Sequence, residues 1–336
     1  MHSPVRLRCA RRRPGKREDM TLTLRAKNPE DLLAAVPVAL GFEPSDSIVM
    51  LTFGGSTAFH ARIDLPPPGD LASLRSVTAS LLEPCRRHRA RQVVFVLYDG
   101  NARRSRQVAR RLGREFERAG VAVLECLRAD AGRWYSADGL RAGVPAHGVP
   151  YDAGAHPFRA QAVMDGHVTL ASRAELAATI TADPAAVAKV EAARDGAAVL
   201  SAAELVRLCA DHAEHGTVPT ALEAAAILLT VQVGPLRDAA WAPLTRDVAE
   251  HHVTLWRALV RQAPDDLLPA GAAVLAFVAW LQGSGALAWC ALDRCLALAP
   301  EHSLGGLVAN LLESAVPPSA WEQLRSSMGD VLGEAG

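Results

Sequence analysis

Hydrophobic and polar positions follow two patterns along the first half of the chain, and together they predict strands separated by helices. Continuous apolar runs have the length of strands and are typical of strands buried on both faces, as in a parallel sheet. Between these runs, apolar residues recur at spacings of three and four, which indicates amphipathic helices. The predicted strands lie at 22–25, 47–53, 57–65, 92–98 and 121–127, and the predicted helices at 28–40, 70–88 and 102–119.

This order of elements predicts an α/β domain over residues 20–130, with a mostly parallel sheet and helices flanking it. The segment 57–65 differs, because its alternation of polar and apolar residues after Gly54-Gly55-Ser56 indicates an edge hairpin. Residues 131–156 are rich in glycine and proline. They predict an irregular loop or linker, and loops of this length are usually functional or mobile.

From residue 157 to 330 strand patterns almost disappear and helix-start motifs recur, which predicts an all-α domain of helical hairpins. These motifs are Ser172-x-x-Glu175, Ser201-x-x-Glu204, Thr220-x-x-Glu223 and Asp183-Pro184. One hairpin near 265–315 resembles a tetratricopeptide repeat in the spacing of Ala276, Gly283, Ala288 and Pro300. Stable arrays of that repeat need about three copies, so the hairpin is either a packing device or a peptide-binding surface.

Charge is balanced over the whole chain but not along it. The 336 residues carry 36 Lys+Arg and 36 Asp+Glu, so no overall field favours nucleic acid or a membrane. Residues 1–150 hold 25 basic and 15 acidic side chains, whereas residues 151–336 hold 11 and 21. Residues 1–19 are strongly basic and lack the apolar core of a secretion signal. We interpret them as a disordered basic tail or as sequence upstream of a true start at Met20.

Cysteine spacing and hydropathy both indicate a cytoplasmic protein. The six cysteines form no C-x-x-C pair and, without a secretion signal, are expected to be reduced thiols. The longest apolar run, 270–281, is far shorter than the roughly twenty residues that a membrane-spanning helix needs. No contact with a membrane is therefore expected.

Standard catalytic motifs are absent from the sequence. It contains no G-x-x-x-x-G-K-[ST] loop, G-x-S-x-G elbow, H-E-x-x-H helix, EF-hand loop or kinase signature. Gly283-Ser284-Gly285-x-x-Ala288 matches a dinucleotide fingerprint, but it joins two predicted helices and follows no strand. Cys209, His212 and His215 share one helix, but no second half-site accompanies them. We therefore expect no cofactor and no metal site.

The most promising place for a ligand is the carboxyl edge of the predicted sheet, where open α/β sheets bind small molecules. Gly54-Gly55-Ser56 and Tyr98-Asp99-Gly100-Asn101 are expected there, and the latter leads into a helix whose first turn contains two arginines. Such a helix start favours an anionic ligand, with the loop after the last strand as a lid. The candidate ligand-binding residues are Ser47, Asp99, Asn101, Arg103, Arg104, Trp134 and Tyr135. The alternative is that Asp99-Gly100-Asn101 is only a turn and a helix cap.

The helix at 102–119 presents a row of arginines opposite its apolar face. These are Arg103, Arg106, Arg110, Arg114 and Arg118. Such a face contacts phosphates in nucleic-acid-binding proteins. A solvated helix surface has the same pattern, as does a face that docks onto the acidic second half of the chain. No aromatic residues are interleaved for base stacking.

Three stretches, 24–51, 132–136 and 279–308, resemble one family. It is the domain-of-unknown-function family numbered 4192, found mainly in actinobacteria, and the resemblance covers residues 22–324. The most specific motif is Gly41-Phe42-x-Pro44-x-Asp46-Ser47, in which Asp46 and Ser47 are candidates to face a site. The resemblance implies no established activity. Many members have cysteines after the Gly-Arg-Trp segment, whereas 136–150 has none here.

These observations predict a cytoplasmic, non-catalytic binding or adaptor protein whose partner is an unknown protein or an anionic small molecule. One alternative is an enzyme, a hydrolase or transferase, that acts on an anionic small molecule through Asp99, Arg103 and Ser47. A second alternative is weak nucleic-acid binding by the arginine-rich helix.

Overall fold

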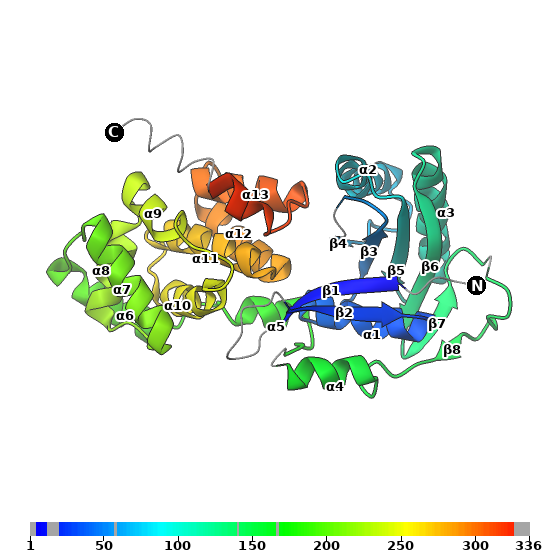
Figure 1. Ribbon diagram of the computed structural model, residues 1–336, viewed down its shortest axis with the longest axis horizontal. Coiled ribbons are helices and arrows are strands. Elements are labelled where there is room, and N and C mark those ends of the chain that lie inside the picture. The colour runs from blue at the N-terminus through cyan, green and yellow to red at the C-terminus, as the bar shows by residue number, and fades with distance from the viewer. Residues whose placement is uncertain (1–4, 12–19, 57–58, 140, 166–167, 326–336) are drawn as a thin grey trace. The chain divides into compact units, whose positions relative to one another are not determined.

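The computed structural model describes residues 5–11, 20–56, 59–139, 141–165 and 168–325. The chain divides into two compact units, Met1–Ser172 and Arg173–Gly336 (Figure 1). The division falls later than the predicted end of the linker at residue 156. The reason is that helix α4 (Pro157–Met164) packs on helix α1 (Pro29–Leu40), where Ala35 and Val38 contact Ala162 and Phe158.

The first unit is built on a six-stranded mixed sheet of order β4-β3-β5-β6-β7-β8. Its strands are β3 Ser47–Phe53, β4 His60–Asp64, β5 Gln92–Tyr98, β6 Ala122–Asp130, β7 Arg133–Ser136 and β8 Val149–Pro150. In this sheet β5 and β6 are parallel, whereas the other neighbouring strands are antiparallel. The prediction of a mostly parallel sheet is therefore wrong. The apolar runs indicate strands that are buried on both faces. A mixed sheet between two helix layers buries its central strands as completely as a parallel sheet does.

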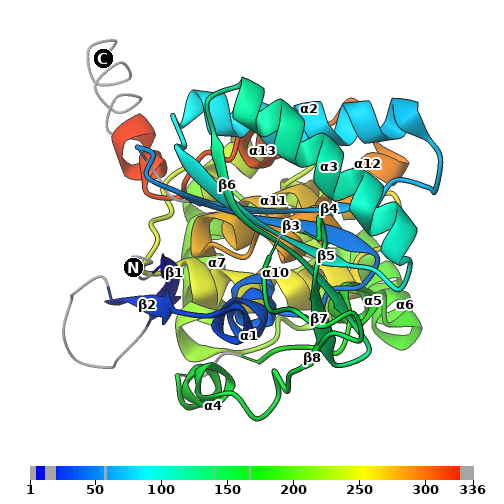
Figure 2. The same cartoon turned by 90° about the vertical axis from the view of Figure 1, so that its right-hand side faces the viewer.

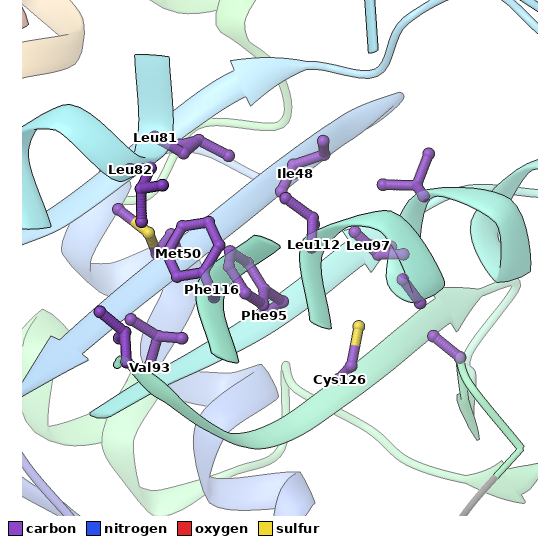
Figure 3. Close-up of a cluster of buried hydrophobic side chains, with 14 of the residues drawn as sticks. Ile48, Met50, Leu81, Leu82, Val93, Phe95, Leu97, Leu112, Phe116 and Cys126 are labelled. Atoms are coloured by element: carbon purple, nitrogen blue, oxygen red, sulfur yellow. The ribbon is translucent and has the colours of Figure 1, made fainter. Parts of the chain in front are cut away.

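Two crossovers place helices α2 (Leu71–Arg87) and α3 (Ala102–Arg118) on one face of the sheet (Figure 2). The first runs from β4 past β3 to β5, and the second runs from β5 to β6. Because both advance across the sheet in the same direction, right-handed connections put both helices on the same side. Figure 3 shows the hydrophobic core between these two helices and the sheet, where side chains of β3 and β5 contact those of α2 and α3. Phe95 and Phe116 pack edge to face, with ring centroids 5.0 Å apart.

Helix α1 lies on the opposite face of the sheet (Figure 2). It begins at an Asn28 cap that accepts a hydrogen bond from the Asp31 amide, and it ends at Gly41, whose φ of 79° is left-handed. The indole of Trp134 on β7 donates to Glu30 in the first turn of α1, at 2.8 Å. This bond ties the helix to the far strands of the sheet.

Two segments differ from their predicted irregular state. Arg133–Ser136 and Val149–Pro150 are strands that extend the sheet beyond β6, inside the stretch predicted as a loop. At the N-terminus, where the sequence analysis expected a disordered tail or sequence upstream of a true start, strand β1 (Val5–Arg11) pairs with β2 (Met20–Ala26). Residues 1–4 and 12–19 lie outside the described residues.

The second unit is helical throughout its described elements. These are α5 Arg173–Ala178, α6 Pro184–Ala193, α7 Ala202–His215, α8 Ala221–Thr230, α9 Gly234–Trp241, α10 Ala249–Gln262, α11 Leu268–Gln282, α12 Gly285–Leu298 and α13 Ser303–Glu313. Capping boxes form at Ser201 with Glu204 and at Thr220 with Glu223, as their spacing predicts. Helix α11 is buried on all sides, so it is the core of a bundle. Within the described residues, we find no helix with the length and apolar character needed to span a bilayer.

Candidate functional site

A pocket of about 320 Å³ lies at the edge of the sheet where β5 and β6 end and β3 begins. It is lined by Glu43, Pro44, Ser45, Asp46, Tyr98, Asp99, Gly100, Ala129, Asp130, Ala131 and Tyr151. One wall of the pocket is formed by residues at the end of β5, where the sequence analysis expected a ligand. The expected position of Gly54-Gly55-Ser56 at this edge is wrong, because β3 runs antiparallel to β5 and pairs Ser47 with Tyr98. The segment before β3 therefore meets Asp99, whereas Gly54-Gly55-Ser56 lies at the opposite edge.

The carboxylate of Asp99 is the best-bonded group at this edge. It accepts hydrogen bonds from the Asn101 amide at 2.8 Å, from Arg104 Nη2 at 2.6 Å and Nε at 3.1 Å, and from Ser105 Oγ at 2.6 Å. Burial alone would raise the pKa of Asp99, but the bonds from Arg104 and Ser105 outweigh it and hold this pKa below its ordinary value. Asp99 is therefore charged at neutral pH, and its lowered pKa does not suit a general acid or base there.

The N-terminus of α3 is satisfied by the protein itself. Asn101 accepts from the amides of Arg103 and Arg104, and Asp99 occupies the position before the helix that an anionic ligand would take. Arg104 also bridges to Asp46 at 2.7 Å, so its guanidinium joins β3 to β5. The side chain of Arg103 is exposed and does not line the pocket.

The other predicted site residues have structural contacts. Ser47 is buried and its hydroxyl donates to the carbonyl of Ser45 at 2.7 Å. Trp134 donates to Glu30, as described above. The ring of Tyr135 lies 3.7 Å from the guanidinium of Arg128, which in turn donates to Asp99 O and Asp130. Because Trp134 and Tyr135 belong to strand β7, they do not form the mobile lid that the loop prediction implied.

The structure adds two tyrosines that the sequence-based selection missed. The hydroxyl of Tyr98 is buried and has no hydrogen-bond partner among the described residues. Burial, with the neighbouring Tyr151 and Glu43, raises the pKa of Tyr98 well above its usual range. Burial also raises the pKa of Tyr151 to about 12, with contributions from Glu43 and Asp130. The sequence signal for Tyr98 was its place at the end of a buried strand, whereas Tyr151 lies 53 positions further along the chain and had none.

Comparison with known proteins identifies the family. The family model described as domain of unknown function (DUF4192) matches residues 29–319. The chain belongs to the DUF4192 family. No curated protein and no solved structure gives a match. The family description states no activity, so the function of this member has to be inferred from its site.

In this DUF4192 protein, the 41–47 motif forms one wall of the pocket. Glu43, Pro44, Ser45 and Asp46 all line it, and Asp46 has a φ of 41°, which is uncommon for a residue with a side chain. On the opposite wall, Ala131 has a φ of 46°. Strained backbone of this kind concentrates at functional sites.

Neither the pocket nor the candidate histidine helix resembles a metal site. No group of three or more His, Cys, Asp and Glu side chains in the described ranges is arranged to hold a metal ion. On α7, Cys209 is buried, His212 bonds to Thr217 at 2.7 Å and His215 is exposed to solvent. The three side chains therefore do not converge on one point.

Proposed function

We propose that this DUF4192 protein is a non-catalytic binding protein of the cytoplasm, and that its α/β unit holds a small molecule in the pocket at Tyr98. The main support for this proposal is that the buried Tyr98 hydroxyl has no hydrogen-bond partner among the described residues. An unsatisfied buried hydroxyl lowers stability by about 1–3 kcal/mol, so a group retained in this state at the wall of a pocket is explained by a ligand that completes its hydrogen bonding. The volume of the pocket is within the range of small-molecule sites.

The contacts of Asp99 and Ser47 support binding over catalysis. A hydrolase or transferase at this edge would need a carboxylate poised near neutral pH or a hydroxyl next to a base. Asp99 has a lowered pKa and uses both oxygens, and the Ser47 hydroxyl donates to a backbone carbonyl. The enzyme alternative therefore has less support than a binding role.

The test is native mass spectrometry of the protein purified from its own host at low salt. We expect one small molecule per chain on the natural protein and its loss in Tyr98→Phe. Tyr135→Phe is the matched control, because it removes the same group from a tyrosine outside the pocket lining. Absence of any retained molecule, or equal retention in both variants, would contradict the proposal.

An adaptor role adds a protein partner on the helical unit. The support is the pair α11 and α12, which meet at Gly283 with a φ of 95° and carry the tetratricopeptide-like spacing. In the same purification, a defined protein that co-purifies equally with the natural chain and with Tyr98→Phe would support this role. Purification of the natural chain without any protein partner would contradict it.

Weak polyanion binding is a second candidate function. Arg103, Arg106 and Arg110 are exposed on α3, and none has an ion pair within the part of the chain that the structure describes. The test is fluorescence polarisation with a labelled DNA duplex at several salt concentrations. Contacts with phosphates predict an affinity that falls steeply with salt and falls again in Arg106→Ala. Affinity that is independent of salt would exclude this function.

A further inference from the structure

We propose that the pocket at Tyr98 binds the ammonium group of a small organic cation. This inference rests on the proposed function and adds the charge of the ligand to it. It reverses the anionic ligand that the sequence predicted, because Arg104, Arg128 and Arg159 are already paired with the carboxylates of the lining and Arg103 does not line the pocket.

The charge of the lining is acidic. Glu43, Asp46, Asp99 and Asp130 line the pocket, and its lining contains no lysine, arginine or histidine. Three arginines outside the lining form ion pairs with these carboxylates: Arg159 pairs with Glu43, Arg104 with Asp46 and Asp99, and Arg128 with Asp130. Four negative and three positive groups leave one net negative charge, and the negative groups are the ones that face the pocket.

The lining also retains hydrogen-bond acceptors. Arg104 bonds to Oδ1 of Asp46, Arg128 to Oδ2 of Asp130, and Arg159 to Oε1 of Glu43. The second oxygen of each carboxylate accepts no bond from another described residue. An ammonium group has three N–H donors and no acceptor, which matches this set of free oxygens.

The two tyrosines complete the match. The Tyr98 hydroxyl, unpartnered and buried, can accept a hydrogen bond from an N–H donor. Burial is the main cause of the raised pKa values of Tyr98 and Tyr151, and the carboxylates of Glu43 and, for Tyr151, Asp130 add to it. With these carboxylates and no basic residue in the pocket lining, the local potential is negative. A negative potential disfavours a carboxylate or phosphate and favours a cation, and aromatic rings stabilise organic cations further.

The experiment compares three probes of nearly equal size: benzylamine, which is a cation at neutral pH, neutral benzyl alcohol and anionic benzoate. Binding to the full chain is measured by titration calorimetry and by ligand-observed NMR. We expect benzylamine to bind with a Kd on the order of 1 mM, about ten times more tightly than benzyl alcohol. Benzoate should show no saturable binding.

Variants then locate the binding. Glu43→Gln should weaken benzylamine binding about fivefold, as expected for the loss of one exposed charge partner worth about 1 kcal/mol, and Asp130→Asn provides an independent second variant. Glu117→Gln is the matched control, since Glu117 is exposed on α3 and does not line the pocket. Thermal unfolding of each variant confirms that it is folded.

The outcomes separate this inference from the proposed function. Tighter binding of benzoate or of benzyl alcohol, weakened by Tyr98→Phe, would overturn the cationic ligand and keep the pocket as a binding site. Equal binding of benzylamine to Glu43→Gln, Asp130→Asn and Glu117→Gln, or no binding at all, would also overturn it. The retained molecule seen by native mass spectrometry tests the binding function independently of these probes.

Discussion

At the scale of single residues, the proposed function depends on the hydroxyl of Tyr98. Its hydroxyl is buried at the end of a central strand and has no partner among the described residues. Evolution toward stability alone would favour phenylalanine at such a position, because removing an unsatisfied buried group is neutral or stabilising. This retained hydroxyl, at the wall of the pocket, is the basis of the proposed binding role.

The first prediction concerns the stability of Tyr98→Phe. Without a ligand, this variant should have a free energy of unfolding about 1 kcal/mol higher than the natural protein, since an unpaired buried hydroxyl is removed. Chemical denaturation followed by far-UV circular dichroism measures the difference. A loss of stability would mean that the hydroxyl has a structural partner, and Tyr98 would then give no support to a bound ligand.

Unlike the Tyr98 hydroxyl, the Asp99 carboxylate has hydrogen-bond partners within the protein on both of its oxygens. Asp99→Asn should lower the free energy of unfolding by about 3 kcal/mol, since it breaks a buried pair and leaves Arg104 partly unpaired. Asp211→Asn is the control, because Asp211 is an exposed partner of His215 and surface pairs contribute little. Equal stability of the two variants would show that the Asp99 network does not hold β3 and β5 together.

At the scale of elements, local chemistry determines where helices begin. Ser201 and Glu204 form a capping box at α7, with the Ser201 hydroxyl accepting from the Glu204 amide and the Glu204 carboxylate accepting from the Ser201 amide. Both groups satisfy helix-end amides that would otherwise be unpaired. The arrangement requires only residues that are three positions apart, which explains why the sequence predicts it.

The prediction at this scale is a loss of stability in Ser201→Ala. Removing the cap should lower the free energy of unfolding by about 1 kcal/mol. Ser76→Ala in α2 is a matched control, because Ser76 is exposed inside a helix and alanine is the better helix former there. Tryptophan fluorescence is the readout for Ser201→Ala, because of the six tryptophans only Trp134 lies in the first unit. A Ser201→Ala variant as stable as the natural protein would show that the cap contributes nothing.

At the scale of the whole molecule, the helical unit should weaken in mild acid. Burial, with nearby His251, lowers the pKa of His252 to about 4 from an unfolded value near 6.5. Between these values the unfolded chain binds the proton more readily, so stability is complete above pH 6.5 and falls as the pH drops toward 4. The expected loss is up to about 3 kcal/mol.

Denaturation at a series of pH values, followed by tryptophan fluorescence, measures this loss. His252→Leu should flatten the dependence, because the buried site no longer titrates. His147→Gln should leave it unchanged, since His147 is exposed in the first unit. Stability in His252→Leu that falls as steeply as in the natural chain would assign the effect to other groups.

The sequence was sufficient for the local features of this fold and insufficient for strand direction. The apolar runs at 47–53 and 92–98 match β3 and β5, because hydrophobic spacing reports which side chains are buried. It carries no information on whether neighbouring strands are parallel. That choice depends on where the connections run, and here β3 is placed between β4 and β5 by a crossover that passes over it.

The sequence by itself determined the helix caps, the positions of the central strands β3 and β5, and the helical second half. Only the tertiary structure decided the composition of the site. It joins Asp46 to Arg104 across 58 positions and places Tyr151 against Glu43. Such contacts arise from strand order and register, which no local pattern encodes. For the same physical reason the sequence did not show that Arg104, Arg128 and Arg159 are paired with carboxylates: the arginines are visible in the sequence, but these pairs appear only in the folded chain.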